Sequence, residues 1–253
     1  MNNQYFKLIN NLDTLGLIEI KNSIDNVIER VNNEELNFTD ALYELTEREL
    51  SFQKERAKVA LIKVANFPFQ KTFSDYDFSF QPSINKNEII DCKYLKFVEN
   101  KENIIFLGPP GVGKTHLATA IGMETALNRI STYFISCHDL ILQLKRAHLE
   151  NRLEQRLKHF TSYTVLIIDE VGYLPLDIEA SNLLFQLITK RYEKKSTILT
   201  TNKNFSEWGE VFGDSVLANA ILDRLLHHSH IITVNGNSYR LKDKLELNSE
   251  SKN

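Results

Sequence analysis

Apolar and polar positions follow a helical period over the first part of the chain. From Asn2 to about Pro68, charged and apolar residues recur at helical spacing, and Gly16 is the only glycine. The clearest helix is predicted to begin near Thr39-Asp40, which offers an N-cap, and to carry one apolar side. That side consists of Leu42, Leu45, Phe52, Val59 and Ile62. The pattern therefore predicts a helical N-terminal domain, residues 1–70.

Short apolar runs separated by helical stretches follow in the rest of the chain. They predict strands at residues 104–107, 132–136, 164–168, 197–200 and 230–234. Near-continuous apolar strands that alternate with helices indicate an α/β fold, with a parallel sheet buried on both faces. Residues 66–82 are rich in Phe, Asp and Ser, and we expect an irregular segment whose aromatic side chains pin it to a neighbouring surface. The predicted divisions are a connector at 71–100, an α/β domain at 101–245 and a flexible tail at 246–253.

Composition narrows the classes of protein without selecting one. Of 253 residues, 42% are hydrophobic, enough for a sizeable core, and no apolar stretch approaches the ~18 residues of a membrane span. The start of the chain lacks the pattern of a secretory signal, so we expect a cytoplasmic protein. Cys92 and Cys137 indicate neither a disulfide framework nor a zinc site. His227, His228 and His230 have no acidic or thiol partner at metal spacing and are interpreted as surface residues.

A complete phosphate-binding loop, GPPGVGKT, occupies residues 108–115. It follows a predicted strand and precedes a predicted helix, Thr115 to Ala126, as such loops require. Its glycines allow backbone N–H groups to surround phosphate oxygens, and the helix N-terminus adds its positive dipole end. We expect Lys114 to reach the β- and γ-phosphates and Thr115 to bind Mg²⁺. The predicted nucleotide-binding residues are Gly108, Pro109, Pro110, Gly111, Val112, Gly113, Lys114, Thr115 and His116.

Two carboxylates end the strand predicted at residues 164–168. Asp169 is expected to hold Mg²⁺, and Glu170 to orient and help deprotonate the water that attacks the γ-phosphate. Acidic residues after a strand are common, so alone they would indicate a solvated loop. Their place after a phosphate-binding loop favours the catalytic interpretation.

Three further polar residues are candidates for the same site. Asn202 follows the next predicted strand and could position the attacking water, or it could be an ordinary turn residue. Arg224 lies in a predicted helix and could serve the site of a neighbouring subunit, or it could form a salt bridge with Asp223 or a nearby carboxylate. Arg240, near the C-terminus, is a similar case.

Six motifs together closely resemble the IstB-like helper ATPases, which accompany the transposase of certain insertion sequences. These proteins are relatives of the DnaC/DnaI helicase loaders in the AAA+ superfamily. The motifs are GPPGVGKTHLA (108–118), LIIDEVGYLP (166–175), ILTTN (198–202), FSEWGEVFGD (205–214), AILDRLLHH (220–228) and SYRLKD (238–243). The resemblance covers nearly the whole chain.

The resemblance implies an AAA+ core with a five-stranded parallel sheet in the order 5-1-4-3-2. It also implies ATP and Mg²⁺ as cofactors, ATP hydrolysis stimulated by oligomerisation and DNA, assembly on duplex DNA, and assistance to a transposase. The implied roles are Walker A for Lys114 and Thr115, Walker B for Asp169 and Glu170, sensor 1 for Asn202, trans-acting finger for Arg224 and sensor 2 for Arg240. One departure is Thr201, because many relatives are expected to have serine before the asparagine.

Basic residues suggest where DNA would bind. Initiator-type AAA+ proteins place a DNA-facing helical element where this chain has residues 137–160. We expect a channel that contacts phosphates rather than bases, lined by Lys145, Arg146, Arg152 and Arg156 together with Lys54, Arg56 and Lys58. The alternative is pairing on one helix face, of Glu150 and Glu154 with Arg146 and Lys158. The net charge of −3 favours neither.

The remaining alternatives differ in partner or in chemistry. A replicative helicase loader would share every ATPase residue, and the partner of residues 1–70 would discriminate it from a transposition helper. A G-protein would need an Asp after Asn202-Lys203, where the chain continues Asn204-Phe205. A kinase would need an acceptor-binding element separate from the sheet, and a catalytically inactive binding module would not need Glu170.

Overall fold

The computed structural model describes residues 3–241 and divides into two compact units. One unit ends at Ala60 and the other begins at Leu61. The predicted tail, residues 246–253, lies outside the described residues, and the functional division at 70 and 100 stays a prediction. Within the described range, the helices are too short or too polar to cross a lipid bilayer.

Three helices form the N-terminal unit, α1 (Asn3–Leu15), α2 (Ile18–Asn32) and the first part of α3 (Phe38–Val64). Their small core consists of Leu12, Ile20, Ile24, Val27, Ala41 and Leu45. Glu49 of α3 is buried, and its carboxylate accepts the N–H groups of Glu19 and Ile20 at 2.8 and 3.1 Å. Because the first N–H groups of a helix have no partner within it, this carboxylate caps α2.

Helix α3 differs from its prediction at its start and along its apolar side. Its first turn is capped by Asn37, whose side-chain oxygen accepts the N–H of Asp40 at 2.9 Å, so the predicted cap at Thr39-Asp40 is wrong. Leu45 is buried, whereas Leu42 and Val59 of the same predicted side are 51% and 66% exposed. The buried side chains of α3 all belong to its first half, which packs in the small core.

A five-stranded parallel sheet organises the second unit. Its strands are β1 (Asn103–Leu107), β2 (Thr132–Ser136), β3 (Val165–Val171), β4 (Ser196–Thr201) and β5 (Ser229–Thr233). They pair in the order β2-β3-β4-β1-β5, which confirms the predicted 5-1-4-3-2 order. The expectation of burial on both faces is wrong for β5, because this edge strand has mostly exposed residues.

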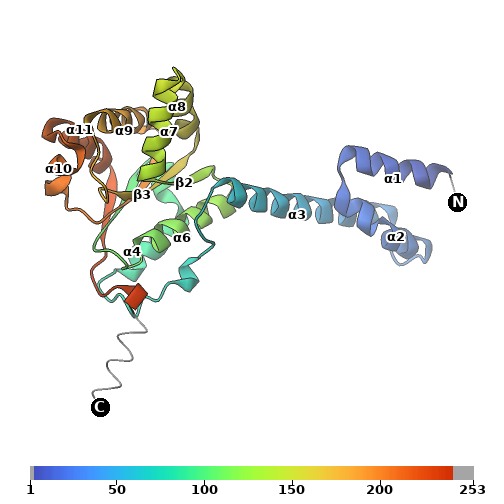
Figure 1. Cartoon of the computed structure of the whole chain (residues 1–253). Coiled ribbons are helices and arrows are strands. Elements are labelled where there is room, and N and C mark those ends of the chain that lie inside the picture. The colour runs from blue at the N-terminus through green and yellow to red at the C-terminus, as the bar shows by residue number, and fades with distance from the viewer. Residues whose placement is uncertain (1–2, 242–253) are drawn as a thin grey trace, which may run out of the picture. The chain divides into compact units, whose positions relative to one another are not determined.

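Two layers of helices flank the sheet (Figure 1), and alternate residues of the strands face one layer or the other. On one face Ile105, Leu166 and Leu199 pack in the cluster that contains α7 (Cys137–Leu149), α8 (Leu153–Ser162), α9 (Ile178–Arg191), α10 (Trp208–Phe212) and α11 (Ser215–Leu226). On the other face Ile104 and Ile167 pack with α6 (Lys114–Leu127). The helical stretch predicted at 137–160 is thus two helices.

The connector closes the second face, and the segment before it reaches the sheet edge. The connector contains the short helices α4 (Lys86–Asp91) and α5 (Lys96–Glu99), and its own side chains Phe73 and Tyr76 are buried. This burial agrees with the expectation that aromatic side chains pin the segment. Two residues beyond the end of α3, the Asn66 side-chain amide donates to the Phe134 carbonyl of β2 at 3.1 Å. The residue before it, Ala65, accepts the N–H of Phe134 at 2.8 Å.

Candidate nucleotide-binding site

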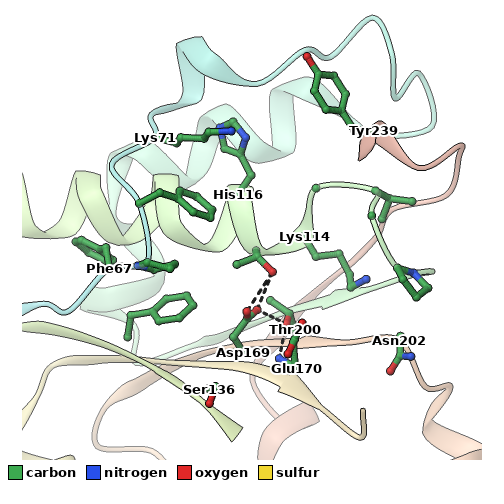
Figure 2. A pocket seen from close by; sticks show the side chains of 18 of the residues that line it. Phe67, Lys71, Lys114, His116, Ser136, Asp169, Glu170, Thr200, Asn202 and Tyr239 are labelled. Atoms are coloured by element: carbon green, nitrogen blue, oxygen red, sulfur yellow. Dashed lines mark hydrogen bonds between the residues drawn. The ribbon is translucent and has the colours of Figure 1, made fainter. Parts of the chain in front are cut away.

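A cavity of about 880 Å³ opens at the carboxyl ends of β1, β3 and β4. This volume falls in the range of ligand pockets, and strand ends of this kind are where α/β sheets bind ligands. The predicted residues that line it are Pro110, Gly111, Val112, Gly113, Lys114, Thr115, His116, Asp169, Glu170, Asn202 and Arg240. Figure 2 shows Lys114, Asp169, Glu170, Thr200 and Asn202 around one part of it.

Two loop glycines are required by neighbouring chain segments as well as by the turn itself. Gly111 and Gly113 have φ angles of +82° and +97°, which favour glycine. A Cβ on Gly111 would lie 2.1 Å from the Ser238 hydroxyl oxygen, and one on Gly113 would lie 2.7 Å from a Tyr76 ring carbon. The loop sequence predicted close approach of phosphate, but not this close approach of two protein segments.

Lys114 and the start of α6 together form a cradle suited to phosphate. Gly113 precedes α6 and has no side chain to accept the helix's first N–H groups, which are therefore available to an anion. The Lys114 ammonium donates to the carbonyls of Gly108 and Pro109, each at 2.7 Å, so it stays within the loop. Burial lowers the pKa of Lys114, while the charges of Asp169 and Glu170 oppose this effect.

Asp169 is held between two hydroxyl groups. The Thr115 hydroxyl donates to the two Asp169 carboxylate oxygens at 3.0 and 3.1 Å, and the Thr200 hydroxyl donates to one of them at 2.5 Å. Burial raises the pKa of Asp169, and the hydrogen bonds from Thr200 and Thr115 counteract the rise. Hydroxyl and carboxylate oxygens are ligands that Mg²⁺ prefers, so these residues fit the predicted metal.

Glu170 leaves the regular strand next to Asp169. The β3–β4 register shifts between Ile168 and Val171, and Glu170 has a φ angle of +62° that non-glycine residues seldom adopt. Its side chain is exposed, whereas Asp169 is buried. The N–H of Glu170 donates to the Thr200 hydroxyl at 2.9 Å. Thr200 thus contacts the Asp169 carboxylate and the Glu170 backbone, a role that the sequence pattern did not reveal.

The two arginine candidates lie in different surroundings. Arg240 lines the cavity, where its charge acts on Lys114. Arg224 of α11 does not line it; its guanidinium donates to the Ala220 carbonyl at 2.9 Å and lies 4.7 Å from the centre of the Phe185 ring. Among the described residues, no ion pair joins Arg224 to Asp223, so the predicted intrahelical alternative is wrong.

The connector supplies a wall of the cavity that sequence patterns missed. Tyr76 donates its hydroxyl to the Val112 carbonyl at 3.1 Å, and its ring meets that of His116 edge-on at 5.2 Å. His116 Nε2 lies 3.1 Å from the Thr72 carbonyl, so this side chain faces the connector. The Gln81 side-chain amide donates to the Asn237 carbonyl at 2.8 Å, which ties the connector to the segment before Arg240.

Most of the predicted DNA-contacting side chains have partners within the chain. In α7 and α8, Arg146 pairs with Glu150 at 3.0 Å, Arg152 also reaches Glu150, Lys145 pairs with Asp177, and Arg156 contacts Gln143. In α3, Lys58 pairs with Glu55 at 2.7 Å, Arg56 lies over Phe52, and Lys54 is exposed. The alternative of helix-face pairing is confirmed for Glu150, whereas Glu154 pairs with Lys190 rather than Lys158.

The IstB-like ATP binding protein family matches residues 10–247. The chain belongs to this family. It is 54% identical over 243 residues to an ATP-binding protein named for insertion sequence IS232 of Bacillus thuringiensis subsp. berliner, covering 96% of this chain and 97% of that one. A counterpart named for IS5376 of Geobacillus stearothermophilus is 50% identical over 216 residues, covering 85% and 86%.

Solved structures confirm the predicted AAA+ arrangement of the IstB-like chain. A crystal structure of the DnaC helicase loader aligns with a TM-score of 0.51 and 26% identity, covering 67% of this chain and 96% of that one. The shared arrangement is the five-stranded parallel sheet with flanking helices.

The packing of the phosphate-binding loop generates the first prediction. Gly113→Ala should weaken ATP binding at least about tenfold, because the new Cβ would collide with Tyr76 and oppose the positive φ angle. Isothermal titration calorimetry measures the affinity. The matched control is Gly16→Ala, since Gly16 also has a positive φ of +70° but has no atom within 4 Å of the added Cβ. ATP binding by Gly113→Ala at the parent affinity would contradict the packing argument.

Proposed function

We propose that this protein is a cytoplasmic, ATP-hydrolysing regulator that assembles on target duplex DNA and assists its transposase. The observation that carries the ATPase part is the hydrogen-bonded group of Thr115, Asp169 and Thr200, beside Lys114 and Glu170 in one cavity. The names of the relatives support the association with transposition, because they join ATP binding to insertion sequences.

The proposed reaction assigns a separate task to each side chain. Lys114 and the first N–H groups of α6 bind and orient the phosphates, and Thr115 and Asp169 would hold Mg²⁺. When bound, Mg²⁺ supplies positive charge against the charge that develops on the phosphate oxygens. Glu170 is exposed to the cavity and accepts the proton of the attacking water, while Asn202 orients that water. The Thr200 hydroxyl donates to the Asp169 carboxylate and accepts the N–H of Glu170.

Glu170→Gln should bind ATP within about threefold of the parent affinity. It should hydrolyse ATP at least about 100-fold more slowly than the parent, since an amide accepts no proton. Phosphate release in single-turnover experiments checks the rate, and calorimetry checks binding. Glu179→Gln is the control, because Glu179 is an exposed carboxylate of α9 outside the cavity. Turnover by Glu170→Gln at the parent rate would remove Glu170 from the mechanism.

The position of Arg224 supports its proposed action on a neighbouring subunit. It does not line the cavity of its own chain, and its contact with Phe185 holds the guanidinium on the surface of α11 and α9. An arginine supplied in trans stabilises the charge that builds up on the transferred phosphoryl group. Hydrolysis would then depend on self-association of the protein.

Mixing two inactive variants tests this dependence. Arg224→Ala should lose about 1000-fold in turnover, yet regain part of it when mixed with Glu170→Gln, which contributes an intact arginine to the neighbouring site. The control is Arg240→Ala mixed with Glu170→Gln, because both defects lie in the cavity and every site stays damaged. If the first mixture shows no more turnover than its components, the trans assignment of Arg224 is wrong.

DNA contact is proposed for the basic side chains of α7 and α8. A hollow of about 400 Å³ between these helices is lined by Arg146, Arg152, Arg156 and His159. The ion pairs of Arg146 and Arg152 with Glu150 are exposed and therefore weak, so these two guanidinium groups can exchange a carboxylate for a DNA phosphate. Contacts of this kind hold the duplex without reading its sequence.

Charge reversal at this surface should abolish retention of duplex DNA. The variant changes Lys145, Arg146, Arg152 and Arg156 to Glu, and fluorescence anisotropy at several salt concentrations measures binding. A control variant makes the same change of charge at Lys96, Lys101, Arg129 and Lys194, which are exposed residues of other elements. Equal loss in both variants would indicate a general charge effect and contradict a DNA surface on α7 and α8.

A helicase loader is the second candidate, and the alignment with the DnaC helicase loader favours it. Both functions share every ATPase residue, so the partner of the N-terminal unit separates them. Capture of a transposase by the full chain, in competition with a replicative helicase, supports the first function. The opposite outcome supports the loader.

A further inference from the structure

A second group of chemically active side chains lies away from the nucleotide cavity. Glu193 is in the turn after α9, and His227 and His228 form the turn after α11. One Glu193 carboxylate oxygen lies 3.7 Å from His227 Nδ1 and 3.7 Å from His228 Nε2. The sequence showed no acidic partner for these histidines because Glu193 belongs to a different part of the chain. The expectation that these histidines have no acidic partner is therefore wrong, whereas their interpretation as surface residues is confirmed.

The distances in this cluster match those of a metal site. One ligand atom from each of the three residues lies within 4.8 Å of the other two. Tetrahedral zinc with bond lengths of about 2.1 Å separates its ligand atoms by about 3.4 Å, so the two Glu193–histidine distances of 3.7 Å would need to shorten by only a few tenths of an ångström. Two imidazoles and a carboxylate form a donor set that zinc accepts and that Mg²⁺ does not favour.

Contacts within the cluster hold part of it in place. The two imidazole rings have centroids 4.0 Å apart, and the Tyr192 hydroxyl lies 2.7 Å from His227 Nδ1, so an ion bound at this nitrogen would replace that hydrogen bond. Glu193 has a φ angle of +55°, a left-handed conformation that is unusual for a residue with a side chain. All three ligand side chains are about half exposed, at 52 to 53%, so water has access to them.

We propose that Glu193, His227 and His228 form a surface site for a divalent transition-metal ion, with zinc as the best-suited ion and water completing its coordination. The site would join the turn before β4 to the end of α11, the helix that carries Arg224. A bound ion would thereby fix the surface next to Arg224, and it would stabilise the folded chain because it binds the folded state preferentially.

Zinc uptake by the full-length protein tests the site directly. Isothermal titration of metal-free protein with zinc chloride should show one more bound zinc ion in the parent than in the triple variant Glu193→Gln, His227→Asn, His228→Asn. Each single substitution should weaken this binding at least about tenfold. The control is His230→Asn, which removes a nearby exposed histidine that pairs with Glu102 instead. It should bind zinc as the parent does.

Two further readouts separate metal binding from ordinary ion pairing. Cobalt(II) added to the parent should give visible absorption bands of four-coordinate cobalt, and the triple variant should lack them. Zinc should raise the melting temperature of the parent and not that of the triple variant, whose far-ultraviolet circular dichroism confirms folding. Equal zinc uptake by the folded triple variant and the parent would overturn the proposal and leave His–Glu ion pairs as the role of the cluster.

Discussion

The site depends on one buried carboxylate and the two hydroxyl groups that hold it. Asp169 comes from β3, Thr115 from the first turn of α6 and Thr200 from the end of β4. Their hydrogen bonds fix the phosphate-binding loop relative to two neighbouring strands. A shift of α6 along the sheet would remove the Thr115 hydrogen bonds of the buried Asp169, which is costly, so the cradle and the acidic strand end keep one relative position.

The same threonine also explains how adjacent carboxylates acquire different environments. In a regular strand, Asp169 and Glu170 would simply point to opposite faces. Here the Thr200 hydroxyl donates to Asp169 and accepts the N–H of Glu170, while the register of β3 against β4 shifts. Asp169 stays buried beside Thr115, and Glu170 is turned into the solvent-accessible part of the cavity. The unusual positive φ angle of Glu170 thus occurs at the point where the two neighbouring carboxylates enter different environments.

Sequence patterns predicted the features that depend on neighbours along the chain. The strand order followed from a family resemblance, and the five strands and the loop at 108–115 followed from apolar runs and glycine spacing. Features that depend on contacts between distant segments were missed, including Thr200, the wall formed by Tyr76, and Glu193 beside two histidines. The sequence pattern predicted too long an apolar side for α3, because helical periodicity does not reveal where the partner helices end.

The missed connector contacts also constrain how the phosphate-binding loop can move. On one side of the loop, the Tyr76 hydroxyl donates a hydrogen bond to the Val112 carbonyl. On another side, the N–H of Tyr239 donates to the Gly111 carbonyl at 2.9 Å. Gln81 joins these two holding segments to each other. A change in loop conformation must therefore alter contacts of the connector. Because these contacts are hydrogen bonds and tight ring packing rather than flexible chain, a rearrangement of the loop must be accompanied by a rearrangement at Tyr76.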